Sequence, residues 1–137
     1  MQTIKLKFGI RAVVRDEDDA LVPSIVKLGI VLMSGNGGLD AAKLAKAIGP
    51  TVDNIDGKLI LETGDPAAAV CHNYVTLPYK PSPAGMARDI AESVVSATVP
   101  DFQFELIAVE FETETTLERH DFGVEELMDG LTGREQK

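Results

Sequence analysis

The sequence has no tryptophan, a single cysteine, Cys71, and only two histidines, His72 and His120. One cysteine excludes a disulfide bond within the chain and any metal site built on several thiolates. Two histidines so far apart do not have the spacing of a metal-ligating pair. We therefore predict no bound metal ion and no cofactor.

Long apolar runs are also missing. No run approaches the roughly 18 apolar residues that a membrane-spanning helix needs. The first five residues lack the apolar core and the small-residue cleavage site of a secretory signal. We therefore expect a soluble, cytoplasmic protein without a membrane partner.

Basic residues are in deficit. The 13 Lys and Arg residues face 22 Asp and Glu residues, and the net charge of -9 opposes binding to the phosphate backbone of nucleic acids. Residues 16–19 are four acidic side chains in a row, which is a pattern that hard cations bind. However, consecutive side chains point in different directions and no glycine stands at the calcium-loop position. We interpret this segment as a solvated turn.

The length and the composition are those of one domain with a real core. A chain of 137 residues with 45% hydrophobic residues can bury about two thirds of its unfolded surface. We predict a single α+β domain over residues 1–114. Residues 115–137 are predicted to be a polar C-terminal extension with a short helix near residues 124–128.

The clearest pattern is the alternation of apolar and charged residues over residues 4–14, which predicts a half-buried β-strand. Residues 101–114 look like its acidic counterpart, with a shift of the apolar phase between Leu106 and Ile107 that suggests a β-bulge or burial on both faces. If the two strands pair antiparallel, Lys5 and Lys7 lie opposite glutamates. We therefore expect these two strands to be neighbours.

Residues 20–33 fit two structures. As a helix, the segment is capped by Asp19, carries Pro23 in its first turn and has an apolar stripe. As a strand, it is rich in β-branched residues, it contains Gly29, and the acidic turn before it becomes a hairpin loop. The helix is slightly favoured. Because the segment is apolar nearly all round, it is expected to be buried either in the core or against another subunit.

The other elements follow from turn and cap signals. The glycine-rich stretch 34–38 lacks the third glycine of a dinucleotide fingerprint and the Gly-Lys-Ser/Thr ending of a phosphate loop, so it is interpreted as a flexible turn. A helix over residues 39–48, stopped by Gly49 and Pro50, is expected next. Strands are predicted over residues 58–62 and 70–77, and a helix begins with Ser82 as its cap and stops at Pro100.

This order of elements predicts an α+β two-layer sandwich of the ferredoxin-like βαββαβ kind, with helices on one side of an antiparallel sheet. If residues 20–33 are instead a strand, the alternative is a mixed sheet that starts with a β-hairpin.

No catalytic signature is present, which favours a protein that is not an enzyme. Cys71 and His72 are adjacent, so on a strand they face opposite sides and cannot act together. The best polar group is His72 with Tyr74 on the same strand face, near Tyr79 and Lys80, since His is the usual acid or base near neutral pH. His120 is interpreted as a solvated residue of the tail.

Three functions are therefore considered. The first is a non-enzymatic structural or assembly subunit that self-associates or binds a protein partner, in a homo-oligomer or a larger particle such as a virion or a tail structure. The second is a small-molecule enzyme with an acid/base site around His72. The third is a regulatory domain that binds a small ligand, which is an argument from fold analogy. They are ranked in that order.

Overall fold

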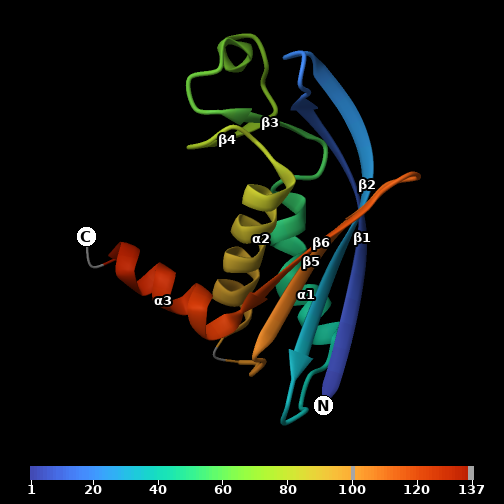
Figure 1. The fold of residues 1–137 in the computed structure, drawn as a ribbon, viewed down its shortest axis with the longest axis vertical. Coiled ribbons are helices and arrows are strands. Elements are labelled where there is room, and N and C mark those ends of the chain that lie inside the picture. The colour runs from blue at the N-terminus through green and yellow to red at the C-terminus, as the bar shows by residue number, and fades with distance from the viewer. Residues whose placement is uncertain (100, 136–137) are drawn as a thin grey trace.

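The computed structural model describes residues 1–99 and 101–135, which form a six-stranded sheet with helices packed on one face (Figure 1). In chain order the elements are β1 (Gln2–Arg15), β2 (Leu21–Ser34), α1 (Ala41–Asp53), β3 (Lys58–Glu62), the 3-10 helix η1 (Pro66–Ala69), β4 (Tyr74–Leu77), α2 (Pro83–Thr98), β5 (Leu106–Glu112), β6 (Leu117–Gly123) and α3 (Val124–Glu135).

The strands follow one another across the sheet in the order β4-β3-β1-β2-β5-β6. The β1–β2, β2–β5 and β5–β6 pairs are antiparallel, whereas the β1–β3 and β3–β4 pairs are parallel. The predicted α+β sandwich is therefore confirmed. Its sheet is the alternative form, a mixed sheet that starts with a β-hairpin.

The helix that was favoured for residues 20–33 is wrong, because this segment is β2. Asp16 closes the hairpin turn: its backbone N–H donates to Ala20, and its side chain accepts from the backbone of Asp18 and Ala20. The second half of β2 lies in the middle of the sheet, between β1 and β5, and is buried on both faces. This double burial removed the alternation that would have marked a strand.

The two strands predicted to be neighbours are separated by β2. The predicted charge pairing nevertheless occurs across it, because Lys5 Nζ reaches Glu110 Oε1 at 2.6 Å over Gly29, a residue without a side chain. Lys7 and Glu112 also approach each other across β2, to 3.8 Å. The apolar phase shift after Leu106 reflects burial on both faces, one of the two predicted causes, because Ile107, Ala108, Val109 and Glu110 are all buried. Residues 101–105 lie outside the strand.

The helices differ from prediction mainly at their ends. Asp40 caps α1 by accepting from the Lys43 N–H, but α1 continues through Pro50 and buries Val52. Ser82 caps α2 and Pro83 occupies its first turn, as predicted. Pro100, the predicted stop of α2, lies outside the described residues.

The segment predicted as a C-terminal extension contains a helix, α3, and also a strand, β6, that pairs with β5 along its whole length. Val124 and Leu127 of α3 are buried in the core. Gln136 and Lys137 lie outside the described residues. Among the residues that are described, no helix is long and apolar enough to cross a bilayer.

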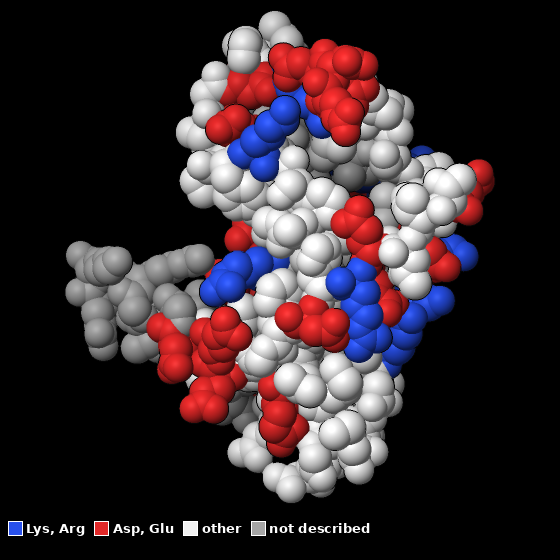
Figure 2. Space-filling model, in the orientation of Figure 1, with Lys and Arg blue, Asp and Glu red and all other residues white. Residues whose placement is uncertain are grey.

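The core lies between the helices and the inner face of the sheet. It is built from the inward residues of β1, β2 and β5 and the apolar faces of α1 and α2, with Leu28, Ile30, Leu32, Leu44, Ile48, Ile107 and Val109 among its most buried members. At the upper end of the molecule, acidic side chains gather around the β1–β2 turn and η1 (Figure 2).

Candidate functional site

The hairpin is longer than the helix that covers it. β1 and β2 have 14 residues each, so each strand spans about 46 Å. α2 has 16 residues, and a helix of that length spans about 24 Å. The upper part of the inner sheet face therefore extends beyond the start of α2.

A cavity of about 260 Å³ lies at this place, between the hairpin, the start of α2 and the β5–β6 turn. Its walls are mainly apolar, and its only charged lining residue among those described is Glu118. The lining residues are Ile10, Ala12, Val14, Ser24, Val26, Pro81, Ser82, Pro83, Met86, Phe111, Thr113, Thr116 and Glu118.

The strand register explains how Glu118 and His120 reach the inner face. Glu118 lies opposite Phe111 and His120 opposite Val109, and residues directly opposite on an antiparallel pair share a face. Val109 is part of the core, so both side chains point toward the helices. Arg119, between them, points to the outer face and pairs with Glu110 at 3.3 Å.

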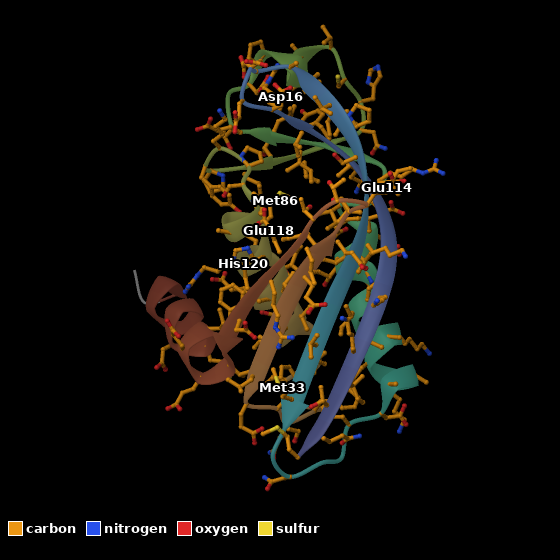
Figure 3. All side chains as sticks on the ribbon, turned by 45° about the vertical axis from the view of Figure 1, so that its right-hand side comes forward. Asp16, Met33, Met86, Glu114, Glu118 and His120 are labelled. Atoms are coloured by element: carbon orange, nitrogen blue, oxygen red, sulfur yellow. The ribbon has the colours of Figure 1, made fainter. Side chains whose placement is uncertain are left out.

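Glu118 and His120 form a carboxylate–imidazole pair. His120 Nε2 lies 3.6 Å from Glu118 Oε2 and is shielded from solvent, without a hydrogen-bond partner among the described residues. Figure 3 shows Met86, Glu118 and His120 in succession along α2 and β6. A buried nitrogen without a partner is costly, and a ligand or proton held between the two groups would remove that cost.

The hydroxyl groups of the cavity differ in availability. The Thr113 hydroxyl pairs with that of Thr116 at 2.7 Å and accepts from the backbone of the β5–β6 turn. The Ser82 hydroxyl is used as the α2 cap. The Ser24 hydroxyl makes no hydrogen bond within the described residues, so Ser24 and Glu118 are the polar groups most open to a ligand.

The residues predicted from the sequence lie elsewhere. His72 is exposed before β4, and Tyr74 is 39% exposed on this edge strand. Neither residue lines the cavity beside Glu118. Tyr79 and Asp89 form their own hydrogen bond of 2.6 Å. A catalytic role of His72 and Tyr74 stays a prediction.

Sequence reasoning missed Glu118 and His120 because their strand lacks an apolar alternation. The inner-face positions of β6 are Glu118, His120 and Phe122, so only the last carries an apolar signal. The available clue was the i, i+2 spacing of an acid and a histidine, which puts both on one face of a strand. Within the described residues, no group of three or more His, Cys, Asp or Glu side chains is placed to hold a metal ion.

The class defined by this fold is an α+β protein in which an antiparallel hairpin and two further antiparallel strands carry helices on one face. No model of a known protein family matches the sequence, and a comparison with curated proteins gives no match. Solved structures do match.

The chain is similar in structure to 6-pyruvoyltetrahydropterin synthases. The enzyme from Plasmodium vivax matches with a TM-score of 0.64 at 13% identity, over 90% of this chain and 99% of that one. The enzyme from Plasmodium falciparum matches with a TM-score of 0.65 at 10% identity, over 89% and 98%. A Plasmodium vivax variant with a catalytic glutamate replaced by alanine also matches, with a TM-score of 0.64 at 12% identity, over 90% and 99%.

These likenesses establish the fold. They also contradict the first-ranked prediction, a non-enzymatic structural or assembly subunit of a virion or a tail structure, because the solved structures named above, which match over nearly their whole length, are those of enzymes. The second-ranked prediction, a small-molecule enzyme, agrees better with them.

Proposed function

We propose that the chain is an enzyme that acts on a small organic molecule bound in the cavity beside Glu118. The observation that carries this proposal is the single carboxylate in the wall of a mainly apolar cavity, backed by the shielded Nε2 of His120. Mainly apolar pockets with a few convergent polar groups are the usual form of small-molecule sites.

The chemistry proposed for the pair is proton transfer. Glu118 lines the cavity and faces the ligand, whereas His120 lies behind it on the same strand face. A carboxylate can accept a proton from a bound N–H or O–H group, and an adjacent imidazole can take up or return that proton near neutral pH. In this proposal Glu118 is the catalytic residue and His120 is its positioning residue and proton partner.

The proposed ligand is a small heterocycle with adjacent N–H donors. A carboxylate binds two parallel N–H groups in a bidentate manner, and the apolar walls suit a flat ring. Pterins are the first compounds to test, because the structural neighbours carry a pterin in their names. Purines and pyrimidines complete the panel.

The test has two stages. A ligand that binds the folded state raises the thermal midpoint by mass action, so the panel is first screened for saturable stabilisation. Turnover of the stabilising compound is then compared in Glu118→Gln, His120→Asn and Glu114→Gln. Glu114 lies in the turn between β5 and β6, close to Glu118 in the chain, but does not line the cavity, so it is the matched control.

We expect Glu118→Gln to lower kcat by about 10²–10⁴-fold, which is the usual contribution of an acid/base group. His120→Asn should lower kcat and alter its pH profile, and Glu114→Gln should leave both unchanged. Loss of turnover in His72→Asn with full turnover in Glu118→Gln would move the site to His72 and Tyr74. Stabilisation without turnover would indicate the regulatory ligand-binding domain.

Self-association is proposed for the same chain, through its strand edges. Arg11 directs its N–H and C=O away from β2, toward Asp56 and Gly57. Backbone groups alternate in direction along an antiparallel strand, so Thr3, Lys5 and Lys7 have the same outward direction. β3 pairs with β1 only at Ala12 and Val13. Among the described residues, the first half of β1 therefore has no strand paired with it on the side away from β2.

β6 is the opposite edge of the sheet. Two unlike open edges on one sheet can pair head to tail between copies, and such contacts close into rings when the rotation allows it. Lys7→Pro removes an outward N–H without removing a β1–β2 hydrogen bond. We expect light scattering to show a multiple of the 14.7 kDa chain mass for the wild type and a smaller species for Lys7→Pro. A wild-type monomer would contradict this proposal.

The cytoplasmic location also stays a prediction.

A further inference from the structure

A groove of about 640 Å³ runs between α1 and α2 and ends at β4. It is separate from the cavity beside Glu118: the groove uses the middle and end of α2, from Asp89 to Ala97, whereas the cavity uses its start, from Pro83 to Met86. α1 and α2 lie side by side in Figure 1, with β4 near their upper end.

The floor of the groove is apolar. It is formed by Ile55 after α1, by Val75 and Leu77 of β4 and by Ile90 of α2. Val75 and Leu77 share one face of β4, and Tyr74 lies on the other. The groove volume is within the range of about 300–1,000 Å³ that is usual for small-molecule sites.

One wall of the groove is polar and acidic. Asp89, Glu92, Ser93 and Ser96 stand at i, i+3, i+4 and i+7 on α2, and this spacing places them on one helix face. The described lining residues include these two carboxylates and no lysine or arginine. Arg88 pairs with Glu92 at 3.2 Å, so the negative charge that this wall offers to a cation is that of Asp89.

A hydrogen bond from Tyr79 holds the side chain of Asp89 in place. The Tyr79 hydroxyl donates to Asp89 Oδ2 at 2.6 Å and so fixes the carboxylate at the groove. Burial and the carboxylates of Asp89 and Glu92 raise the pKa of Tyr79, so the hydroxyl stays a donor at neutral pH. This hydrogen bond uses one carboxylate oxygen, and the other can accept from a ligand.

We propose that this groove is a second ligand site that binds an organic cation, with the ligand's amine on Asp89 and its apolar body on the floor formed by Ile55, Val75 and Leu77. The site is independent of the proposed enzymatic cavity. Its ligand class follows from the acidic wall and the apolar floor together. The wall favours an amine over a carboxylate, and the floor favours an amine that carries an apolar body.

The test compares two probes of the same ring and opposite charge, phenethylamine and 3-phenylpropionate, by amide chemical-shift titration of the full-length protein. We expect saturable shifts at Asn54, Ser93 and Ser96 with the amine and none with the carboxylate. Asp89→Asn should weaken the amine by about ten-fold, the loss expected for one charge-assisted hydrogen bond. Asp53→Asn removes an exposed carboxylate at the end of α1 that does not line the groove, and it should leave the affinity unchanged.

Ser96→Leu provides a second variant that does not touch the Tyr79–Asp89 bond. Leucine is a better helix former than serine, and its side chain fills the groove, so binding of phenethylamine should be lost while the fold is kept. Glu118→Gln should keep binding, which separates this site from the enzymatic proposal. Absence of saturable shifts, equal binding of the carboxylate, or unchanged affinity in Asp89→Asn and Ser96→Leu would overturn the proposal.

Discussion

Gly29 of β2 has no side chain, and a lysine of β1 therefore reaches a glutamate of β5 across it. Lys5 and Glu110 meet above it, and Arg119 approaches the same carboxylate from β6. Glu110 is only 5% exposed, and its hydrogen bond from Lys5 lowers its pKa. A Cβ on Gly29 would lie 3.1 Å from Glu110 Oε1 and 3.2 Å from Glu110 Cβ. The close packing of this charge pair therefore requires glycine.

We expect Gly29→Val to destabilise the fold by about 1–3 kcal/mol, the usual cost of overpacking, because Glu110 must move and its contact with Lys5 lengthens. Gly9→Val is the matched control. Gly9 is on the neighbouring strand, and a Cβ there has no heavy atom within 4 Å. Valine suits a strand better than glycine, so Gly9→Val should be neutral or stabilising in a urea titration. Equal effects of the two variants would contradict this role of Gly29.

Arg15 and Asp65 tie the end of the hairpin to η1. Arg15 Nε donates to Asp65 Oδ2 at 2.6 Å, and Arg15 Nη2 donates to Asp65 Oδ1 at 2.8 Å. Asp65 also caps η1 by accepting from the Ala67 N–H. These hydrogen bonds, that from Arg15 first, lower the pKa of Asp65 to about 2.

The pH dependence of stability follows from this shift. The pKa of Asp65 is about 2 in the folded state and about 3.9 in an unfolded chain, so its contribution is complete above pH 4 and is lost as the pH falls toward 2. Asp65→Asn keeps a good cap and removes the charge.

We expect Asp65→Asn to flatten the fall of the free energy of unfolding between about pH 4 and pH 2, measured by urea titrations. Asp101→Asn changes an exposed residue and should keep the wild-type slope. A wild-type slope in Asp65→Asn would contradict the assignment.

At the scale of elements, α2 contributes residues to the core, to the cavity and to the groove. Its start is set by Ser82, whose hydroxyl accepts from the Gly85 N–H, and by Pro83 in the first turn. This cap and proline signal was readable in the sequence, and the helix was predicted from it. α2 then buries Ile90, Val94 and Val95 against the sheet.

Ser82→Ala should cost about 1 kcal/mol of stability, since an unsatisfied N–H is left at the helix start. Ser96→Ala, on an exposed position of the same helix, should be neutral or slightly stabilising because alanine is the better helix former. Thermal or urea unfolding of the two variants measures the difference. A loss in Ser96→Ala as large as that in Ser82→Ala would contradict the capping role.

The elements that could be predicted are those with one buried and one solvated face. β1 alternates cleanly because its outer face carries Lys5 and Lys7. β2 could not be assigned because its second half is buried on both faces, which gives a run that fits a helix or a strand. β6 was not predicted because Glu118 and His120 occupy inner positions that core residues would fill in an ordinary strand.

At the scale of the whole molecule, the sequence predicts the layered class but not the position of the site. The cavity is formed by residues from β1, β2, α2, β5 and β6 that are distant in the chain. No local spacing brings Ser24, Met86 and Glu118 together, so only the fold reveals them. His72 and Tyr74 were selected because they share one face of the predicted strand over residues 70–77, but the structure places Tyr74 on the edge strand β4 and His72 before it.

The central claim is that the cavity beside Glu118 is the ligand site. The most direct measurement is an amide chemical-shift map of the wild-type protein with the first compound of the panel that stabilises it. The account predicts saturable shifts centred on Ser24, Met86, Thr116 and Glu118, and their loss in Glu118→Gln but not in Glu114→Gln. Shifts centred on residues 70–77, or shifts that persist unchanged in Glu118→Gln, would contradict it.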